Sequence, residues 1–376
     1  MRLFRNFLRY SLAAVVLFLS TAAAAETGAE KMNEEIKKLK KRVEEIEAEQ
    51  EEARHSYGTL SRLVDVSGYA DVEFILTDEE GQNNRFRVKH LSLFFTKEIG
   101  KKWKLFTEIE YEDAPVVEAN SSTDTVKRTQ GMIFLEQMYI EYRPKVDYDV
   151  RAGRFLTPAG IWNIYHYPPY VPMQTPPLFI GNIFPGVSDG IQVRKTFPVK
   201  DSTLDAHVYA ANGSGNPGRL DRNENKAAGA RLNYSVEALG GLEFGASYYR
   251  EEDNSGVMKM SYGAHLLFTR SKFSLQSEYA FRNNHPQTSR DYVDRGAYAQ
   301  LSYETGKWTI AGRYDWFDSD STDSRNDRFR QTAALNYALA HNVVGKAEYN
   351  RNVFEDPALK DYNELIFAIV VATGDL

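Results

Sequence analysis

The sequence predicts an all-β protein, a 16-stranded antiparallel transmembrane β-barrel with a short N-terminal coiled-coil helix. The first observation is that segments of about ten residues alternate apolar and polar side chains from Val66 to the C-terminus. In the range 103–111, for example, Leu105 lies on the face opposite Glu108. The second is that short and long connections between these segments alternate. A period of two with short turns on one side only is typical of an outer-membrane barrel.

Sixteen strands are expected, and an even number places both ends of the barrel on one side of the membrane. They are 65–76, 85–97, 102–112, 132–143, 147–155, 187–197, 203–212, 226–236, 241–250, 258–269, 272–282, 293–304, 307–317, 328–339, 342–354 and 362–372. Connections after even-numbered strands are short, whereas those after odd-numbered strands include 113–131, 156–186, 213–225 and 318–327. A soluble β-sandwich, the alternative, predicts no such one-sided split.

Composition narrows the class of protein. The 376 residues have a mean hydropathy of −0.50 and 26% charged side chains. These values exclude a bundle of membrane helices but not a barrel, because only one face of each strand meets the lipid bilayer. The 23 tyrosines and 21 phenylalanines fit aromatic belts at two membrane interfaces. A net charge of −6 argues against nucleic acid as a partner, and the absence of cysteine excludes thiolate sites, so no cofactor is expected.

Residues 1–25 have the features of a signal peptide. Arg2, Arg5 and Arg9 precede an apolar run over 12–19, and small residues lead to an Ala-x-Ala site that ends at Ala25. A transmembrane anchor is the alternative, but the apolar run is too short to span a bilayer. With the barrel at 63–376, this predicts a protein of the bacterial outer membrane.

Residues 26–62 are predicted to form a periplasmic coiled-coil helix and a linker. Ile36, Leu39, Val43 and Ile46 recur at spacings of three and four within a stretch that lacks glycine and proline. A single solvated helix is the alternative. The heptad interpretation makes these four side chains an oligomerisation seam between protomers.

Strand phase predicts which charges face the lumen. In 307–317, Trp308 and Ile310 share one face, and Arg313 and Asp315 share the other. The basic residues expected inside are Arg85, Arg87, Lys89, Arg143, Arg151, Arg194, Arg231, Arg313 and Arg330. The acidic residues expected inside are Asp71, Glu73, Glu108, Glu110, Glu141, Asp205, Glu243, Glu278, Asp315 and Glu348. Each charge either contributes to ion selectivity or forms an ion pair with a neighbouring strand that stabilises the wall, and the ion pair is the favoured interpretation for most of them.

Arg85, Arg87 and Lys89 are the strongest selectivity candidates, because a single neighbour cannot neutralise three like charges. After them the alternation changes phase, since Leu91 continues the basic face. A β-bulge near His90 would restore the phase.

The connection 156–186 is predicted to fold inward and narrow the channel. Sixteen strands enclose a water-filled lumen rather than a packed core. Seven prolines exclude a regular helix, and the segment is too apolar for a solvated loop. The candidate constriction residues are Pro158, Trp162, Tyr165, Tyr167 and Tyr170. An external lid or a protomer contact is the alternative.

The segment 153–163, Gly-Arg-Phe-Leu-Thr-Pro-Ala-Gly-Ile-Trp-Asn, resembles the Gly-basic-x-x-x-Pro-x-Gly-x-x-Asn stretch before the third loop of the phosphate-selective porin O and P family. The order of signal peptide, coiled coil, sixteen-stranded barrel and long third loop is similar to that family too. The resemblance implies a homotrimeric channel in which inward arginines and lysines bind phosphate through charge-assisted hydrogen bonds. The mixed charges of this lumen, and a chain that ends in Leu376 rather than an aromatic residue, depart from the family pattern.

Catalytic and metal-binding patterns are weak. The chain has no Gly-x-Ser-x-Gly, His-Glu-x-x-His or phosphate loop, and its seven histidines lack ligand spacing. Neither an enzyme nor a metal site is therefore expected. The acidic stretch 318–323 has the composition of a Ca²⁺ loop, but a hydrated external loop is the favoured interpretation.

The predicted function is passive diffusion of small hydrophilic solutes, including inorganic anions such as phosphate, through a channel in the lipid bilayer. Two alternatives stay open. One is a structural or adhesive barrel that anchors the envelope through its coiled coil, and the other is a barrel sheath around a partner protein.

Overall fold

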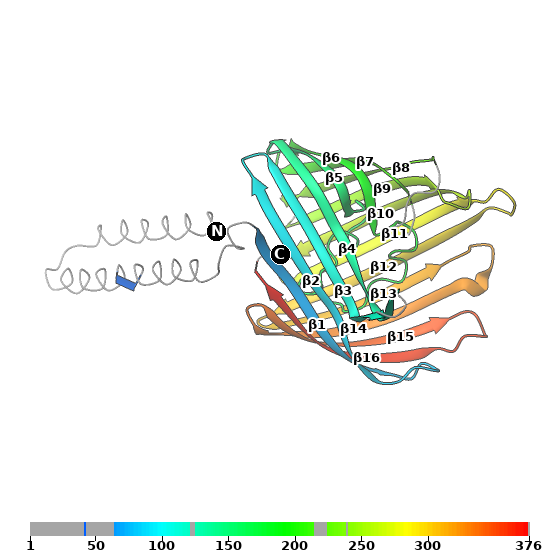
Figure 1. The fold of residues 1–376 in the computed structure, drawn as a ribbon. Helices are drawn as coiled ribbons and strands as arrows, with labels where there is room; N and C mark the ends of the chain where they lie inside the picture. Colours follow the sequence, from blue (N-terminus) through cyan, green and yellow to red (C-terminus); the bar gives the residue numbers. More distant parts are fainter. Residues whose placement is uncertain (1–40, 43–63, 121–124, 214–223, 238–239, 375–376) are drawn as a thin grey trace. The chain divides into compact units, whose positions relative to one another are not determined.

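The computed structural model describes residues 41–42, 64–120, 125–213, 224–237 and 240–374. Over these ranges sixteen antiparallel strands form one closed barrel, in which β1 pairs with β2 on one side and with β16 on the other (Figure 1). The strands are β1 (Asp65–Thr77), β2 (Arg85–Ile99), β3 (Trp103–Asn120), β4 (Thr125–Lys145), β5 (Tyr148–Leu156), β6 (Val187–Val199), β7 (Ser202–Ala211), β8 (Ala227–Val236), β9 (Leu242–Glu252), β10 (Met258–Arg270), β11 (Phe273–His285), β12 (Tyr292–Thr305), β13 (Trp308–Asp318), β14 (Asp327–Ala340), β15 (Val343–Phe354) and β16 (Tyr362–Thr373). The predicted barrel is confirmed.

The predicted signal peptide and the seam of Ile36, Leu39, Val43 and Ile46 lie outside the described residues. Within the described part of the chain, no helix is both long and apolar enough to cross a membrane.

The one-sided split of connections is also confirmed. After each even-numbered strand up to β14, the chain leaves the sheet for only two to five residues. Lys200, Ser271 and Gly306 in these turns have positive φ of 54°, 57° and 60°. Tight hairpin turns need left-handed residues, because their twist then matches that of the flanking strands.

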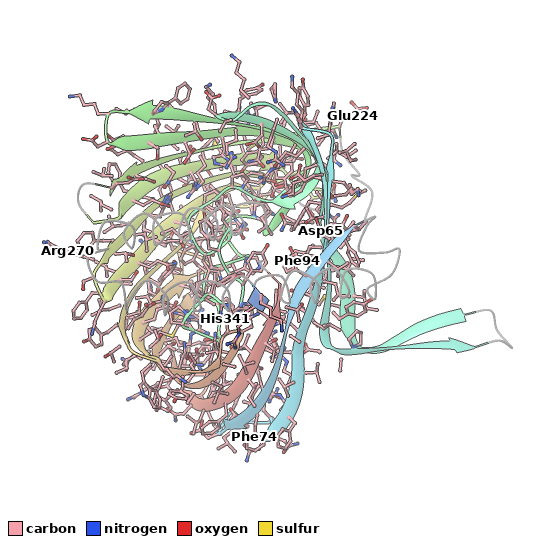
Figure 2. All side chains as sticks on the ribbon, turned by 90° about the vertical axis from the view of Figure 1, so that its left-hand side faces the viewer. Asp65, Phe74, Phe94, Glu224, Arg270 and His341 are labelled. Carbon is pink, nitrogen blue, oxygen red and sulfur yellow. The ribbon has the colours of Figure 1, made fainter. Side chains whose placement is uncertain are left out.

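One predicted loop is wrong. The segment 113–131 continues β3 and β4 as a paired hairpin up to Asn120 and Thr125. In Figure 2 this hairpin projects away from the ring of strands. Its β-branched residues, such as Val116 and Val117, favour extended backbone, and the two arms satisfy each other's hydrogen bonds without help from the barrel.

Aromatic pairs mark the outer surface near both ends of the strands. Beside the short turns, Trp103–Tyr142, Phe273–Tyr303 and Trp308–Tyr337 have ring centroids 4.5–4.7 Å apart. Toward the opposite ends lie Phe74–Phe86, Tyr262–Phe281 and Tyr314–Phe329. Between them are exposed aliphatic side chains, among them Ile140, Ile191, Leu301 and Ile310. This arrangement is an apolar band between two aromatic belts, as in outer-membrane barrels.

Candidate functional site: the lumen and its inserted loop

Because successive side chains of a strand point to opposite faces, every second residue of each strand lines the inner face of the barrel. In β13, Ala311, Arg313 and Asp315 are buried, whereas Ile310 and Tyr314 are about half exposed to the outside, at 51% and 50%. The register with β14 places Asp315 opposite Arg330. The strand phase predicted for 307–317 is therefore observed.

The bulge predicted in β2 is observed as well. Asp71 of β1 pairs with His90, and the next residue, Val72, pairs with Val88. Lys89 is thus the extra residue, and Arg85 and Arg87 return to the inner phase beyond it.

The basic cluster of β2 is neutralised more fully than its sequence predicts. Both carboxylate oxygens of Asp113 accept hydrogen bonds from Arg87. Glu73 lies 3.8 Å from Arg87, and Lys89 Nζ is 4.0 Å from Glu112 Oε1. Several carboxylates from β1 and β3 surround the cluster. The prediction assumed that only one neighbouring carboxylate would be available to three basic side chains, and this assumption is wrong. Arg85 has no such ion pair among the described residues and donates to the carbonyl of Asn83.

Arginines of β4, β5 and β6 form a connected chain of ion pairs. Side chains of Arg143 and Arg194 are each 38% exposed, and that of Arg151 is 25% exposed. The pairs Arg143–Glu98, Arg143–Glu141, Arg151–Glu141 and Arg194–Asp149 have N–O distances of 2.6–2.8 Å, and Arg151–Asp149 at 3.7 Å connects them. Among the predicted lumen cations, these three arginines are both held by short ion pairs and partly exposed to water.

Arg231 and Arg313, by contrast, lie beneath the inserted loop. Arg231 Nε donates to the carbonyl of Gly160 at 3.2 Å. Arg313 is fully buried, pairs with Asp315 at 2.8 Å, and stacks over the Trp162 ring at 5.4 Å. Both predicted pore-lining arginines therefore contact the loop rather than open lumen.

The connection between β5 and β6, residues 157–186, runs inside the ring of strands (Figure 2). It makes hydrogen bonds to inner side chains from many parts of the wall. They include Gly160 N to Ser247, Trp162 N to Glu278, Gln174 N to Glu348, Lys346 to the carbonyls of Pro168 and Val171, Asn336 to that of Pro172, and Ser261 to that of Ile183. Backbone groups of an irregular segment at this depth need such partners.

The five predicted constriction residues occupy two kinds of position. Pro158 and Trp162 are buried against the wall. The Tyr167 hydroxyl lies 3.3 Å from Glu108 and 3.0 Å from Gln137. Tyr165 and Tyr170 are 61% and 63% exposed, so these two side chains face open space.

Sequence reasoning placed Glu278 and Glu348 in the lumen but missed their contacts with the loop, and it missed Lys346 altogether. Glu278 accepts from the Trp162 backbone at 2.7 Å and from the Tyr298 hydroxyl at 2.5 Å. Lys346 Nζ lies 2.8 Å from both of its carbonyl acceptors. The available signal was a charge on the inner phase of a strand with no carboxylate, lysine or arginine of opposite sign directly across from it on either neighbouring strand.

Several solved structures share this fold. The OmpF complex with daunomycin from Salmonella typhi has a TM-score of 0.59 at 11% identity and covers 82% of this chain and 97% of that chain. The anion-selective porin of Comamonas acidovorans scores 0.57 at 12% identity and covers 82% and 99%. The outer membrane channel DcaP of Acinetobacter baumannii scores 0.55 at 13% identity and covers 82% and 96%.

At the level of sequence, an uncharacterized protein of Aquifex aeolicus (strain VF5) is 28% identical over 126 residues. That match covers 34% of this chain and 27% of the relative's length. Residues 11–357 match the family described as Gram-negative porin. Together with the closed barrel and its aromatic belts, this match shows that the chain belongs to the Gram-negative porins, the channels of the outer membrane.

Proposed function

We propose that this porin passes small hydrophilic solutes by passive diffusion and prefers inorganic anions such as phosphate. The observation that carries the proposal is the accessible arginine chain of Arg143, Arg151 and Arg194 within a closed barrel. Arginines fixed in a wall replace part of the hydration of a passing anion with charge-assisted hydrogen bonds. The resemblance of the segment 153–163 to phosphate-selective porins also supports a preference for anions over cations.

The preference is expected to be modest. Each arginine of this chain shares a carboxylate with a neighbour, and the basic cluster of β2 is also surrounded by carboxylates. Paired charges present a weaker field to a passing ion than free ones do.

Reversal potential in planar bilayers under a tenfold KCl gradient tests this. A triple variant Arg143→Gln, Arg151→Gln, Arg194→Gln should move the potential toward cation preference, and charge reversal of Arg85, Arg87 and Lys89 should do so less. Arg325→Gln, which removes an exposed outer-loop charge, is the control. If the wild-type protein gave no current steps at saturating density in the bilayer, the proposed channel function would be refuted. An unchanged potential in the triple variant would exclude these arginines as its origin.

The segment 156–186 is proposed as the constriction, with Pro158 and Trp162 as anchors, Tyr167 as a contact to the wall, and Tyr165 and Tyr170 facing the passage. Its contacts with inner side chains support this. Truncating Tyr165 and Tyr170 together to alanine should raise single-channel conductance. Unchanged conductance would place the narrowest point elsewhere.

A homotrimer is proposed as the assembly, with residues 1–25 removed on export and 26–62 as a periplasmic coiled coil. On the outer wall, Arg154 forms a bidentate ion pair with Asp189 beside exposed Met138 and Ile191. A hollow of about 690 Å³ lies between these residues. An ion pair facing hydrocarbon is unfavourable, which supports cover by a second protomer. A barrel of this fold, OmpT of Vibrio cholerae, is described in a trimer form.

A further inference from the structure

Three glutamates gather on the inner face where β3 meets β4. Glu108 and Glu110 are two residues apart on β3, so they point to the same side. Glu108 pairs with Gln137 and the next residue, Ile109, pairs with Leu135. Glu136 is therefore the extra residue of a β-bulge, and a bulge redirects a side chain that strand phase would send outward. All three glutamates are buried, with 0%, 4% and 8% of their surface exposed.

The spacing of these carboxylates suits one metal ion. One oxygen from each glutamate lies within 4.8 Å of the others. Ca²⁺ binds oxygen at 2.3–2.6 Å, so two ligands of the same ion lie at most about 5 Å apart. A donor set made of carboxylate oxygens is the chemistry that a hard divalent cation prefers.

The charges around this cluster are not balanced. Among the described residues, no lysine or arginine nitrogen forms an ion pair with Glu108, Glu110 or Glu136, whereas Glu141, Asp149 and Asp315 each have an arginine. Two histidines are close. His90 lies 2.8 Å from Asp71 through Nδ1 and 3.6 Å from Glu112 through Nε2, and His166 Nε2 lies 3.2 Å from Glu136 Oε1. Apart from these two histidines, the described residues place no basic side chain within ion-pair distance of the three adjacent carboxylates.

A second observation points to a missing ligand. Glu136 Oε2 is buried, and no N–H or hydroxyl group in the described part of the chain donates a hydrogen bond to it. Leaving a carboxylate oxygen buried and unpaired is costly. Buried Glu278 and Glu348, also in the lumen, instead accept hydrogen bonds from backbone groups of the loop. A bound cation would supply the partner that Glu136 lacks.

The surroundings hold the other oxygens in place. Ser92 Oγ donates to Glu108 Oε1 at 2.9 Å, and the Tyr69 hydroxyl donates to Glu110 Oε2 at 2.7 Å. Such outer hydrogen bonds orient carboxylates at metal sites. The Tyr167 hydroxyl and His166 reach the same cluster from the inserted loop.

We propose that Glu108, Glu110 and Glu136 bind a divalent cation, Ca²⁺ by their donor chemistry. The ion joins β3, the bulge of β4 and the start of the inserted loop, and thereby holds this end of the loop against the wall. The site does not depend on which solute the channel passes.

Calcium titration of the full-length mature protein tests the site. The protein is refolded without lipopolysaccharide, which itself binds Ca²⁺, and is dialysed against EDTA. Calorimetry should find one Ca²⁺ per chain for the wild type and for the control Glu243→Gln, a lumen carboxylate next to Arg231. Glu136→Gln should lower the affinity by about tenfold or more, because ligand charge sets Ca²⁺ affinity.

A second measurement needs no variant. Tb³⁺ in this site should give luminescence excited through Tyr69 or Tyr167, and Ca²⁺ should displace it whereas K⁺ should not. Wild type that binds no Ca²⁺, or Glu136→Gln that binds it equally well, would overturn the proposal. Zn²⁺ binding in place of Ca²⁺, lost in His166→Ala, would overturn the all-oxygen donor set.

Discussion

At the scale of single residues, two glycines show how closely the inserted loop is fitted to the wall. Gly160 and Gly181 both have left-handed backbone, with φ of +60° and +76°. A Cβ on Gly160 would lie 1.7 Å from Glu278 Oε2, whereas a Cβ on Gly181 would meet nothing within 4 Å. The same backbone strain therefore occurs with and without a packing conflict.

Gly160→Ala should destabilise the barrel more than Gly181→Ala. Both substitutions cost about 1 kcal/mol from the left-handed conformation. Only Gly160→Ala also displaces the Glu278 carboxylate from the Trp162 backbone. A lower Tm and noisier open-channel current are expected for Gly160→Ala alone. If both variants lowered the Tm equally, the close contact between Gly160 and Glu278 would contribute nothing to the stability of the barrel.

One residue outside the spanning strands gives a pH dependence. Hydrogen bonds from the Asn363 backbone and side chain lower the pKa of the Asp78 carboxyl below its usual 3.8. A lowered folded-state pKa means that the contact is fully present above pH 3.8 and is lost as the pH falls through the lowered value. The Asn363 amide signal in NMR should titrate with a midpoint below 3.8. Asp78→Asn should remove that titration, and a midpoint above 3.8 would contradict the interpretation.

At the scale of elements, the inserted loop is held by polar contacts as well as by packing. Its buried Phe179 and Ile183 join a cluster with Phe155 and Tyr298, and Lys346 of β15 binds two of its carbonyls. Phe155 belongs to β5, but Tyr298 and Lys346 come from β12 and β15, which are far from the loop in sequence. Loop position and barrel closure are thus separable by mutation.

Lys346→Met should loosen the loop while the barrel stays closed. The substitution removes two hydrogen bonds from a charged donor, each worth about 1.5–3 kcal/mol. We expect faster proteolysis between Pro168 and Val171 and larger fluctuations of the open-channel current. The melting temperature of the β-sheet signal in circular dichroism should not change. Lys360→Met, an exposed lysine paired with Glu80, is the control. Protease sensitivity equal to that of the control would refute this role for Lys346.

Sequence periodicity predicts strands better than it predicts their irregularities. The bulge near His90 was visible because the basic phase of β2 changes there. The bulge at Glu136 was not visible, because polar residues on both phases of β4 hide the shift. The hairpin within 113–131 was also missed, since its arms pair only with each other.

At the scale of the whole molecule, the Arg154–Asp189 pair predicts an assembly contact. Arg154→Asp should disrupt the pair and weaken oligomers, and Arg154→Asp with Asp189→Arg should restore them. Breaking a desolvated ion pair costs more than an exposed one, because one charge is left without its partner. Light scattering in mild detergent gives the mass. Oligomers that survive Arg154→Asp unchanged would place the protomer contact on another part of the wall.

By itself the sequence determined the number of strands, the alternation of short and long connections, and the inward direction of charges that follow the regular strand phase, such as Arg313, Glu278 and Glu348. These properties depend on a local period of two and on turn residues, so a single chain carries them. Only the tertiary structure decided which carboxylate each arginine meets, how the segment 157–186 crosses the lumen, and that Glu136 joins Glu108 and Glu110. The physical reason is distance along the chain: partners such as Gln174 and Glu348 meet only once the barrel has closed.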